Sequence, residues 1–282
     1  MPVPGYDGFF GAYLFSGTRR AIVDIGPTAT VPGLLESLAA LGIDRDEVDY
    51  VVLTHIHIDH AGGTGTALRA LSNARAVVHP AGRRHLADPA QLQEASIRTS
   101  GTQVLNYGPI EPVPEDRMLS AEDGMRLDLG TGVVLELVLT PGHAQHHLSV
   151  FERGDGILLA GDAAGVCFNG ALRSASPPPF HFEKAMASLD RLLALHPKRL
   201  CYAHLGCYDG APQRLEAMKR KLVYWREVAR RGAAAGRDPE ATLSVLMRED
   251  PDLAYLDGLG PFEYEREYGF LITDVRGLAD AR

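Results

Sequence analysis

Three imidazoles and one carboxylate fall within six residues of this chain, at His55, His57, Asp59 and His60. They follow residues 49–53, an apolar and β-branched run that predicts a buried strand. His and Asp clustered at this spacing indicate a metal site, because neutral imidazoles and carboxylates are ligands that Zn²⁺ accepts. The alternative, a polar loop that is rich in histidine by chance, is disfavoured by the tight spacing. We therefore expect a metal site where this strand ends.

Three more metal-competent side chains, His143, Asp162 and His204, each follow an apolar run that predicts a strand. A single His after a strand is more often structural than a ligand. Strand ends of open sheets are, however, where ligand sites are built. Three such residues, together with the cluster at 55–60, are therefore better explained by convergence on one site.

These motifs resemble those of the metallo-β-lactamase superfamily, and the resemblance covers roughly residues 8–210. It implies an α/β fold, the four-layer αββα sandwich of that family. It further implies two metal sites, the first held by His55, His57 and His143, the second by Asp59, His60 and His204, with Asp162 bridging both. Asp24 would lie behind a ligand imidazole, accepting its hydrogen bond and fixing its tautomer.

The same resemblance implies hydrolytic chemistry with two Zn²⁺ ions, although this set of nitrogen and oxygen donors also suits Fe or Mn. Metal ions lower the pKa of bound water, so a bridging hydroxide is the expected nucleophile. Asp59 is the candidate for carrying the proton to the leaving group. Cys167 and Phe168, just after Asp162, are candidates for contacting the substrate.

Other motifs of the sequence bear on the class of substrate. Gly62-Gly63 and the four-residue step from His143 to His147 resemble the glyoxalase II and lactonase group, which favours small esters, thioesters or lactones. Two features depart from that group: the glutathione element Gly-Cys-Gly-Arg/Lys is missing after Asp162, and Gly165 stands where the lactonases carry a Tyr. A phosphodiesterase on the same metals, a mononuclear iron persulfide dioxygenase and a non-catalytic scaffold remain as alternatives.

Composition excludes some classes of function. The net charge is −8, from 28 Lys and Arg against 36 Asp and Glu, which disfavours a nucleic-acid partner. No apolar run approaches the roughly 18 residues that span a bilayer, and the N-terminus has no signal-peptide pattern. The three cysteines have no paired-framework spacing and are expected as free thiols in a cytoplasmic protein. We expect a small-molecule substrate as the partner, no membrane contact, and leave a homo-oligomer open.

The chain divides at about residue 210 into two expected parts. Residues 1–210 form the catalytic domain and residues 211–282, richer in charge and in helical periodicity, form a helical C-terminal extension that packs near the active-site edge. Within the first part the turn and periodicity signals predict strands at 9–16, 20–25, 76–79, 125–129, 133–139, 147–152, 156–160 and 199–202, helices at 31–41 and 182–195, and a loop at 99–119.

Overall fold

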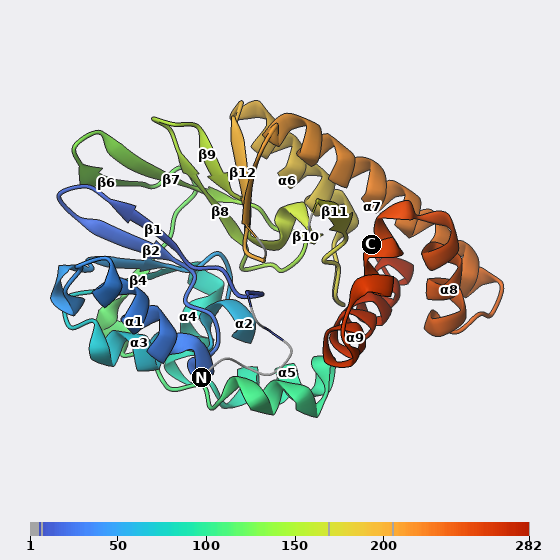
Figure 1. Ribbon diagram of the computed structural model, residues 1–282, viewed down its shortest axis with the longest axis horizontal. Coiled ribbons are helices and arrows are strands. Elements are labelled where there is room, and N and C mark those ends of the chain that lie inside the picture. The colour runs from blue at the N-terminus through green and yellow to red at the C-terminus, as the bar shows by residue number, and fades with distance from the viewer. Residues whose placement is uncertain (1–5, 7, 169, 205, 282) are drawn as a thin grey trace.

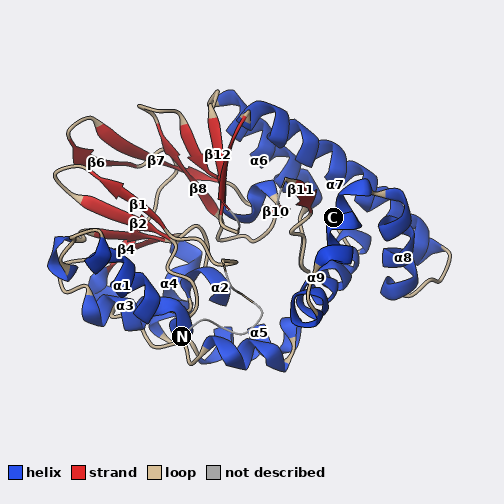
Figure 2. Cartoon of the chain, viewed as in Figure 1, coloured by secondary structure: helices blue, strands red, loops and turns tan. Residues whose placement is uncertain are grey.

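The computed structural model describes residue 6 and residues 8–168, 170–204 and 206–281. In this part of the chain two mixed β-sheets lie face to face, and helices cover the outer face of each (Figure 1; Figure 2). This arrangement confirms the predicted four-layer αββα sandwich with helices appended at the C-terminus.

The N-terminal sheet has the strand order β1-β2-β3-β4-β5 among the described residues. β1 and β2 form the expected antiparallel hairpin, and β2 to β5 run parallel. Their connections carry helices, as parallel strands require. The strands are Tyr13–Ser16 (β1), Arg20–Val23 (β2), Tyr50–Val52 (β3), Arg75–Val78 (β4) and Met118–Ser120 (β5), and the helices beside them are Val31–Ala40 (α1), Thr64–Ala70 (α3), Pro80–Ala87 (α4) and Ala90–Ser100 (α5).

The second sheet has the order β13-β12-β9-β8-β7-β6 in the described chain. It is antiparallel except where β9 pairs with β12 in parallel through the helix α6. Its elements are Arg126–Gly130 (β6), Val133–Leu139 (β7), Leu148–Glu152 (β8), Ile157–Leu159 (β9), Phe182–Ala194 (α6), Arg199–Tyr202 (β12) and Gly206–Asp209 (β13), with a separate hairpin of Val166–Phe168 (β10) and Ala171–Arg173 (β11).

Three hydrophobic clusters correspond to the three interfaces between the four layers. The central cluster joins the two sheets through residues such as Val52 and Leu135. A second cluster lies between the first sheet and its helices, around Ile22 and Leu68. The third holds the second sheet against α6 and the C-terminal helices, with Trp225 fully buried. Alternation of buried positions along each strand explains how one sheet can supply two of these cores.

The C-terminal helices are Ala211–Ala234 (α7), Pro239–Glu249 (α8) and Pro261–Ala279 (α9), with a 3₁₀ segment Pro251–Gly258 (η6) between the last two. α9 returns toward the catalytic half and lies beside α5 (Figure 1). There Gly277 packs on the main chain of Ser176, so closely that an added Cβ would lie 1.8 Å from the Ser176 carbonyl oxygen. No helix in the described part of the chain is long and apolar enough to cross a lipid bilayer.

Several sequence expectations need correction. The segment 99–119, expected as loop, contains the 3₁₀ turns Thr102–Tyr107 and Glu115–Arg117 and the edge strand β5. The stretch after Asp162, where no strand was predicted, contains the β10–β11 hairpin. Cys201 and Cys207, expected as free thiols, are joined by a disulfide because they face each other across the β12–β13 pair, and only Cys167 is free.

Candidate metal centre

The clustered ligand residues lie where β3 ends and a single helical turn begins. After β3 the chain has no regular secondary structure up to His57, which caps the short helix Ile58–Ala61 (α2) with β-region dihedral angles. His55 and His57 therefore lie on the connection before the helix, whereas Asp59 and His60 are adjacent on the helical turn. Gly62 and Gly63 form the turn between α2 and α3. Gly63 is needed for packing, because a Cβ there would lie 3.0 Å from the Pro27 carbonyl oxygen.

The structure brings the three downstream residues to the same edge. His143 lies in the connection after β7, Asp162 in the turn that follows β9, and His204 in the connection after β12. All three side chains are largely buried, at 3–8 % exposure. These three segments follow strands of the second sheet, whereas the cluster at 55–60 follows β3 of the first sheet, so the site lies where the two sheets meet at one edge.

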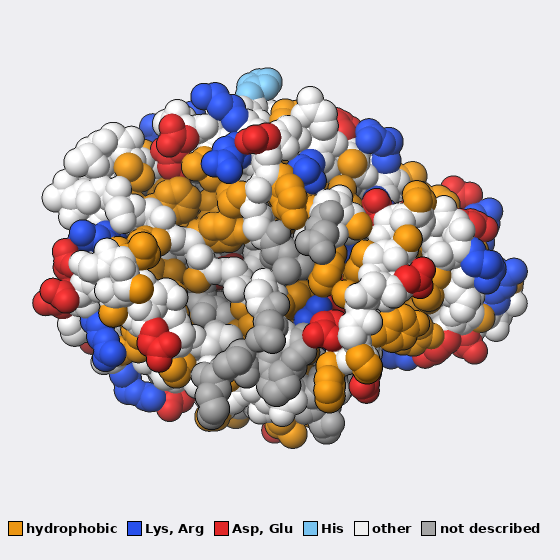
Figure 3. Space-filling view, viewed as in Figure 1, with side chains coloured by type: hydrophobic (Ala, Val, Ile, Leu, Met, Phe, Trp, Pro, Cys, Tyr) orange, Lys and Arg blue, Asp and Glu red, His pale blue; other side chains and the backbone are white. Residues whose placement is uncertain are grey.

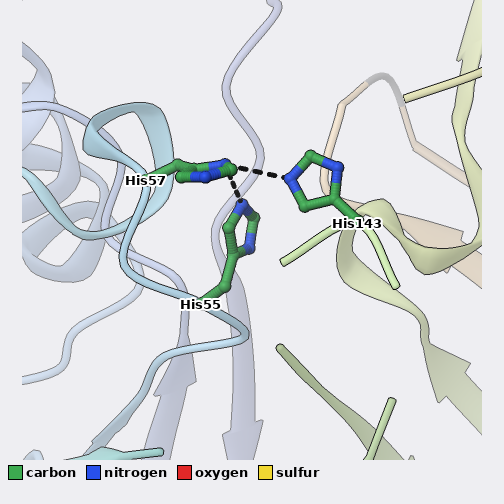
Figure 4. Close-up of side chains that lie close together, drawn as sticks. All are labelled: His55, His57 and His143. Atoms are coloured by element: carbon green, nitrogen blue, oxygen red, sulfur yellow. Dashed lines mark hydrogen bonds between the residues drawn. The ribbon is translucent and has the colours of Figure 1, made fainter. Parts of the chain in front are cut away.

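The first group of candidate ligands is His55, His57 and His143, whose ligand atoms lie within 4.8 Å of one another. His57 Nδ1 lies 3.0 Å from His55 Nε2 and 2.9 Å from His143 Nε2 (Figure 4). The three rings point toward one another from two different connections, which is the arrangement of an open three-histidine metal site.

The second group is Asp59, His60 and His204. The Oδ2 atom of Asp59 lies 3.6 Å from His60 Nε2 and 3.5 Å from His204 Nε2. Asp162 lies between the two groups: its Oδ2 is 3.6 Å from His143 Nε2, and its Oδ1 is 3.5 Å from His60 Nε2 and 3.8 Å from His204 Nε2. One carboxylate thus faces both histidine sets.

The donor set fits metal ions. Buried polar atoms normally have hydrogen-bond partners, yet His60 Nε2 and Asp162 Oδ1 have none among the described residues. The other ring nitrogen is occupied in each of three ligands: His143 Nδ1 lies 2.8 Å from the Ala175 carbonyl oxygen, His204 Nδ1 3.1 Å from that of Phe9, and His60 Nδ1 3.0 Å from Asp24 Oδ2. Each Nδ1 therefore carries the proton, and each Nε2 lone pair is directed at the centre.

Asp24 and Thr54 form a buried support beneath this centre. The Asp24 carboxylate accepts hydrogen bonds from the Thr54 backbone N–H and from its hydroxyl, both at 2.8 Å, in addition to the His60 contact. Asp24 has a positive φ of 57°, which is tolerated by Asp more readily than by most residues. The expected role of Asp24 behind a ligand imidazole agrees with this geometry.

His147 supports Asp162 from the opposite side. Its Nε2 accepts a hydrogen bond from the Asp162 backbone N–H at 3.1 Å, while its Nδ1 lies 2.8 Å from the Thr140 hydroxyl. Gly161 makes this approach feasible, because a Cβ there would lie 2.6 Å from His147 Nε2. His147 is thus a supporting residue that fixes the turn carrying Asp162, and it has no nitrogen left for a metal.

The charges of the buried side chains favour a cation at the centre of the site. Burial and the neighbouring imidazoles hold the pKa values of His55 and His57 well below the usual range, so both rings are neutral. Burial also opposes the protonation of His60, but Asp162 and Asp59 outweigh it and raise the pKa of that ring well above its usual value. The carboxylates thus favour a cation at His60, and a metal ion meets the same demand.

A cavity of about 800 Å³ opens onto these residues. Its described lining is largely apolar and comes from the connection after β3, from α5, from the Pro-rich segment 177–179 and from α9. Figure 3 shows one face of the molecule, on which hydrophobic side chains gather across the middle. α9, in the C-terminal extension, contributes Phe270, Thr273 and Asp274 to this wall.

Cys167 and Phe168, expected to contact the substrate, lie elsewhere. Cys167 is fully buried in the core beneath α7, and Phe168 stacks on Tyr255. Neither is among the described residues that line the cavity. Val166 and Arg173, which pair across the β10–β11 hairpin, line the cavity instead, and alternation along β10 turns the intervening Cys167 to the opposite face.

Sequence reasoning missed the carbonyl groups of Phe9 and Ala175 that orient His204 and His143. Main-chain acceptors carry no side-chain signal, so no motif could have revealed them. His85 and His146, which no motif singled out, also line the cavity. Thr54, directly before the motif, could have been inferred from its position at the strand end.

Comparison with known proteins identifies the superfamily to which the chain belongs. The sequence profile of the metallo-β-lactamase superfamily matches residues 12–204, so the chain belongs to that superfamily. It is 33 % identical over 210 residues to the metallo-β-lactamase fold-containing protein ST1585 of Sulfurisphaera tokodaii, covering 72 % of this chain and 78 % of that protein. The crystal structure of ST1585 superposes with a TM-score of 0.76 at 26 % identity, covering 98 % of this chain and 94 % of that one.

Two further relatives extend the comparison. A hydroxyacylglutathione hydrolase of Aeromonas hydrophila is 30 % identical over 203 residues, covering 72 % of this chain but 63 % of its own length. The structure of the metallo-β-lactamase family protein TTHA1429 from Thermus thermophilus superposes with a TM-score of 0.66 at 25 % identity, covering 95 % of this chain and 86 % of that one.

Proposed function

We propose that this metallo-β-lactamase superfamily hydrolase uses two metal ions to cleave small esters, thioesters or lactones. The observation that carries the proposal is the placement of Asp162 between two complete histidine-containing ligand groups. One group alone would support a mononuclear site. Two groups that share a carboxylate support a dinuclear one.

His55, His57 and His143 would hold one ion, and Asp59, His60 and His204 the other, with Asp162 between them. The six nitrogen and oxygen ligands beside Asp162 suit Zn²⁺, and Fe or Mn as well. When bound, such ions supply Lewis acidity and lower the pKa of water to about 7. The hydrogen bonds behind His60, His143 and His204 fix the tautomers that this chemistry needs.

Asp59 is the residue proposed to move the proton. Its side chain is 21 % exposed at the cavity, whereas the other carboxylate of the centre, Asp162, is 9 % exposed. Burial opposes its ionisation, but His60 and His204 outweigh burial and hold the pKa of the Asp59 carboxyl below its usual range. An ionised Asp59 can accept a proton beside the scissile bond and deliver it to the departing oxygen or sulfur.

The choice of substrate class rests on the cavity and on relatives. A cavity of about 800 Å³ that combines apolar side chains with a few charged groups suits a small organic acyl compound. The similarity to a hydroxyacylglutathione hydrolase supports thioesters within that class. The missing Gly-Cys-Gly-Arg/Lys element after Asp162 argues against glutathione as the thiol part.

Metal analysis combined with a substrate panel tests the proposal. The panel holds a short-chain thioester, a p-nitrophenyl ester, a lactone and bis-p-nitrophenyl phosphate. We expect two ions per chain and turnover of at least one carbonyl substrate that is lost in Asp162→Ala. Phosphodiester turnover far above carbonyl turnover would instead support a phosphodiesterase, and one iron per chain without hydrolysis would support an iron-dependent oxygenase.

A further inference from the structure

A buried charge cluster lies in the cavity wall, outside the metal ligands. Arg173 on β11 is 3 % exposed, and it faces two carboxyl groups of α9, those of Glu267 (0 % exposed) and Asp274 (3 % exposed). Arg173 and Asp274 both line the cavity. Burying a guanidinium is costly unless every donor is used, so its contacts identify what it does.

Two of the three guanidinium nitrogens of Arg173 have partners. Nε donates to Glu267 Oε2 at 2.7 Å, and Nη1 donates to the Ser174 carbonyl oxygen at 3.0 Å. Among the described residues no hydrogen bond involves Nη2. Nη2 is not one of the fully buried polar atoms without a partner, so it keeps some exposure. The guanidinium carbon lies 5.3 Å from the ring centre of Phe270, which also lines the cavity. Nη2 is therefore the amino group available on the cavity side.

The charge of Arg173 is only partly compensated. Glu267 is shared, because its Oε1 also accepts a hydrogen bond from Arg266 Nε at 3.0 Å and its Oε2 one from the Tyr255 hydroxyl at 2.9 Å. Asp274 Oδ2 forms an ion pair with Nη1 at 3.6 Å, beyond hydrogen-bond distance, and it has no hydrogen-bond partner among the described residues. Burial raises the pKa of Asp274 to about 7, so near neutral pH this carboxyl is only partly ionised. Arg173 thus shares one carboxylate and faces a second that is only partly charged.

A purely structural tie between β11 and α9 would need neither an available amino group nor an incompletely balanced charge. We propose that Arg173 is a substrate-binding residue that receives a carboxylate on the substrate, in addition to the ester, thioester or lactone bond at the metal ions. A guanidinium N–H suits a carboxylate oxygen in length and direction. A monoanion is the fitting class, because a single amino group of this one guanidinium is available. This inference rests on the proposed function and names its substrate class.

Paired substrates test the proposal in the metal-loaded enzyme. Glutaryl thioesters, which carry a free carboxylate, are compared with the matching glutaramyl thioesters, in which a neutral carboxamide replaces it. A second pair carries the carboxylate or carboxamide on the thiol part. The measured quantity is the ratio of kcat/KM for the acid over that for the amide, which cancels effects common to both substrates.

Three variants change this ratio in different directions. Arg173→Gln removes the cation and should lower the ratio by about 10- to 100-fold, the usual effect of losing a charge-assisted hydrogen bond. Arg173→Lys keeps the charge without the planar group and should give a ratio between those of the wild type and Arg173→Gln. Asp274→Asn removes the competing carboxyl while its amide oxygen still accepts from the Ser176 N–H, a bond of 2.6 Å in the wild type, and should raise the ratio about threefold or more.

Loss of folding is separable from loss of the subsite. If Arg173→Gln does not fold, Asp274→Asn and the double variant Arg173→Gln/Glu267→Gln, which removes the buried charge partner as well, carry the test. Ratios that stay within twofold of wild type for both substrate pairs would overturn the proposal.

Calorimetry separates the failure of this inference from that of the proposed function. Glutarate should bind the metal-loaded wild type more tightly than butyrate, and Arg173→Gln should lose that difference. If the wild type cleaves no thioester but still shows the Arg173-dependent difference, the proposed function fails and the carboxylate site stands. If thioesters are cleaved and the difference is absent or unaffected by Arg173→Gln, the carboxylate site fails alone.

Discussion

Replacing Asp24 by Asn tests whether the carboxylate beneath the ligands controls metal affinity. Asp24 accepts three hydrogen bonds, two from Thr54 and one from His60 Nδ1. An amide has one acceptor oxygen, so its NH₂ group must face at least one of these donors. Asn adopts the positive φ of this position as readily as Asp, and the backbone is therefore not disturbed.

Asp24→Asn is expected to lower both folding stability and metal affinity. Facing a buried donor with another donor costs about 1–3 kcal/mol of folding stability. Losing the carboxylate behind a ligand imidazole lowers metal affinity by about 10- to 100-fold. The loss should be larger for the second ligand group, because His60 bonds Asp24 directly, whereas His55 of the first group is linked to it only through the Thr54 hydroxyl, which lies 3.1 Å from His55 Nδ1.

Chelator competition followed by metal analysis measures this loss ion by ion. Asp49→Asn is the matched control, since the Asp49 Oδ2 also accepts a backbone hydrogen bond, from Arg20 N at 2.8 Å, and lies outside the ligand groups. We expect one weakly held and one tightly held ion in Asp24→Asn and wild-type behaviour in Asp49→Asn. Equal loss of both ions, or no loss, would refute the assignment of Asp24 to the second group.

Other predictions follow from the same structure. Removing the metals with a chelator should lower the melting temperature measured by calorimetry, because a ligand present at 100 times its Kd adds about 2.7 kcal/mol to the stability of the folded state; an unchanged melting temperature would contradict buried metal sites. Gly277→Ala should destabilise the protein by about 1–3 kcal/mol in denaturant unfolding, because its Cβ would lie 1.8 Å from the Ser176 carbonyl oxygen, whereas Gly33→Ala, with nothing within 4 Å in a helix interior, should be neutral or stabilising. Asp274 has a folded-state pKa of about 7, raised from 3.8 by burial and opposed by Arg173, with Asp162 and Glu267 as further charged neighbours. The folded state therefore binds this proton more tightly than the unfolded state, and its contribution to stability is lost as pH rises from about 4 through 7. Asp274→Asn should flatten that part of the stability curve, and an equally steep curve in the variant would show that another group is responsible.

The ligand cluster could be predicted from the sequence because its signal is local. His55, His57, Asp59 and His60 lie on one short segment, and each later ligand directly follows an apolar strand. Asp24 was placed by the resemblance to the family, and in the structure it comes directly after β2. Strand ends of one sandwich meet at one edge, so a linear pattern was enough to predict a shared site.

The cavity wall could not be predicted in this way. Arg173 and Glu267 are 94 residues apart, and the hydrogen bond between them depends on how α9 folds back over the hairpin β10–β11. Each strand of that hairpin has three residues, too few for a periodic pattern. The expected contact residues Cys167 and Phe168 were chosen by proximity to Asp162 in sequence, but Cys167 faces the core and Phe168 stacks on Tyr255 of the C-terminal extension.

The disulfide between Cys201 and Cys207 was missed for a related reason. The two residues bracket the turn that carries His204, and β13 is a four-residue edge strand without strong β-propensity in its first and last positions, Gly206 and Asp209. Because that strand was not predicted, nothing in the sequence indicated that the two cysteines face each other. The pairing became evident only once the register of β12 and β13 was known.

The most direct test of the central claim is metal stoichiometry in three proteins purified side by side, the wild type, His57→Ala and His204→Ala. His57 belongs to the first ligand group alone and His204 to the second alone. The account predicts two ions per chain in the wild type, about one in each variant, and thioester or ester hydrolysis reduced by orders of magnitude in both. A single ion in the wild type that is lost completely in one variant and unaffected in the other would contradict a dinuclear centre.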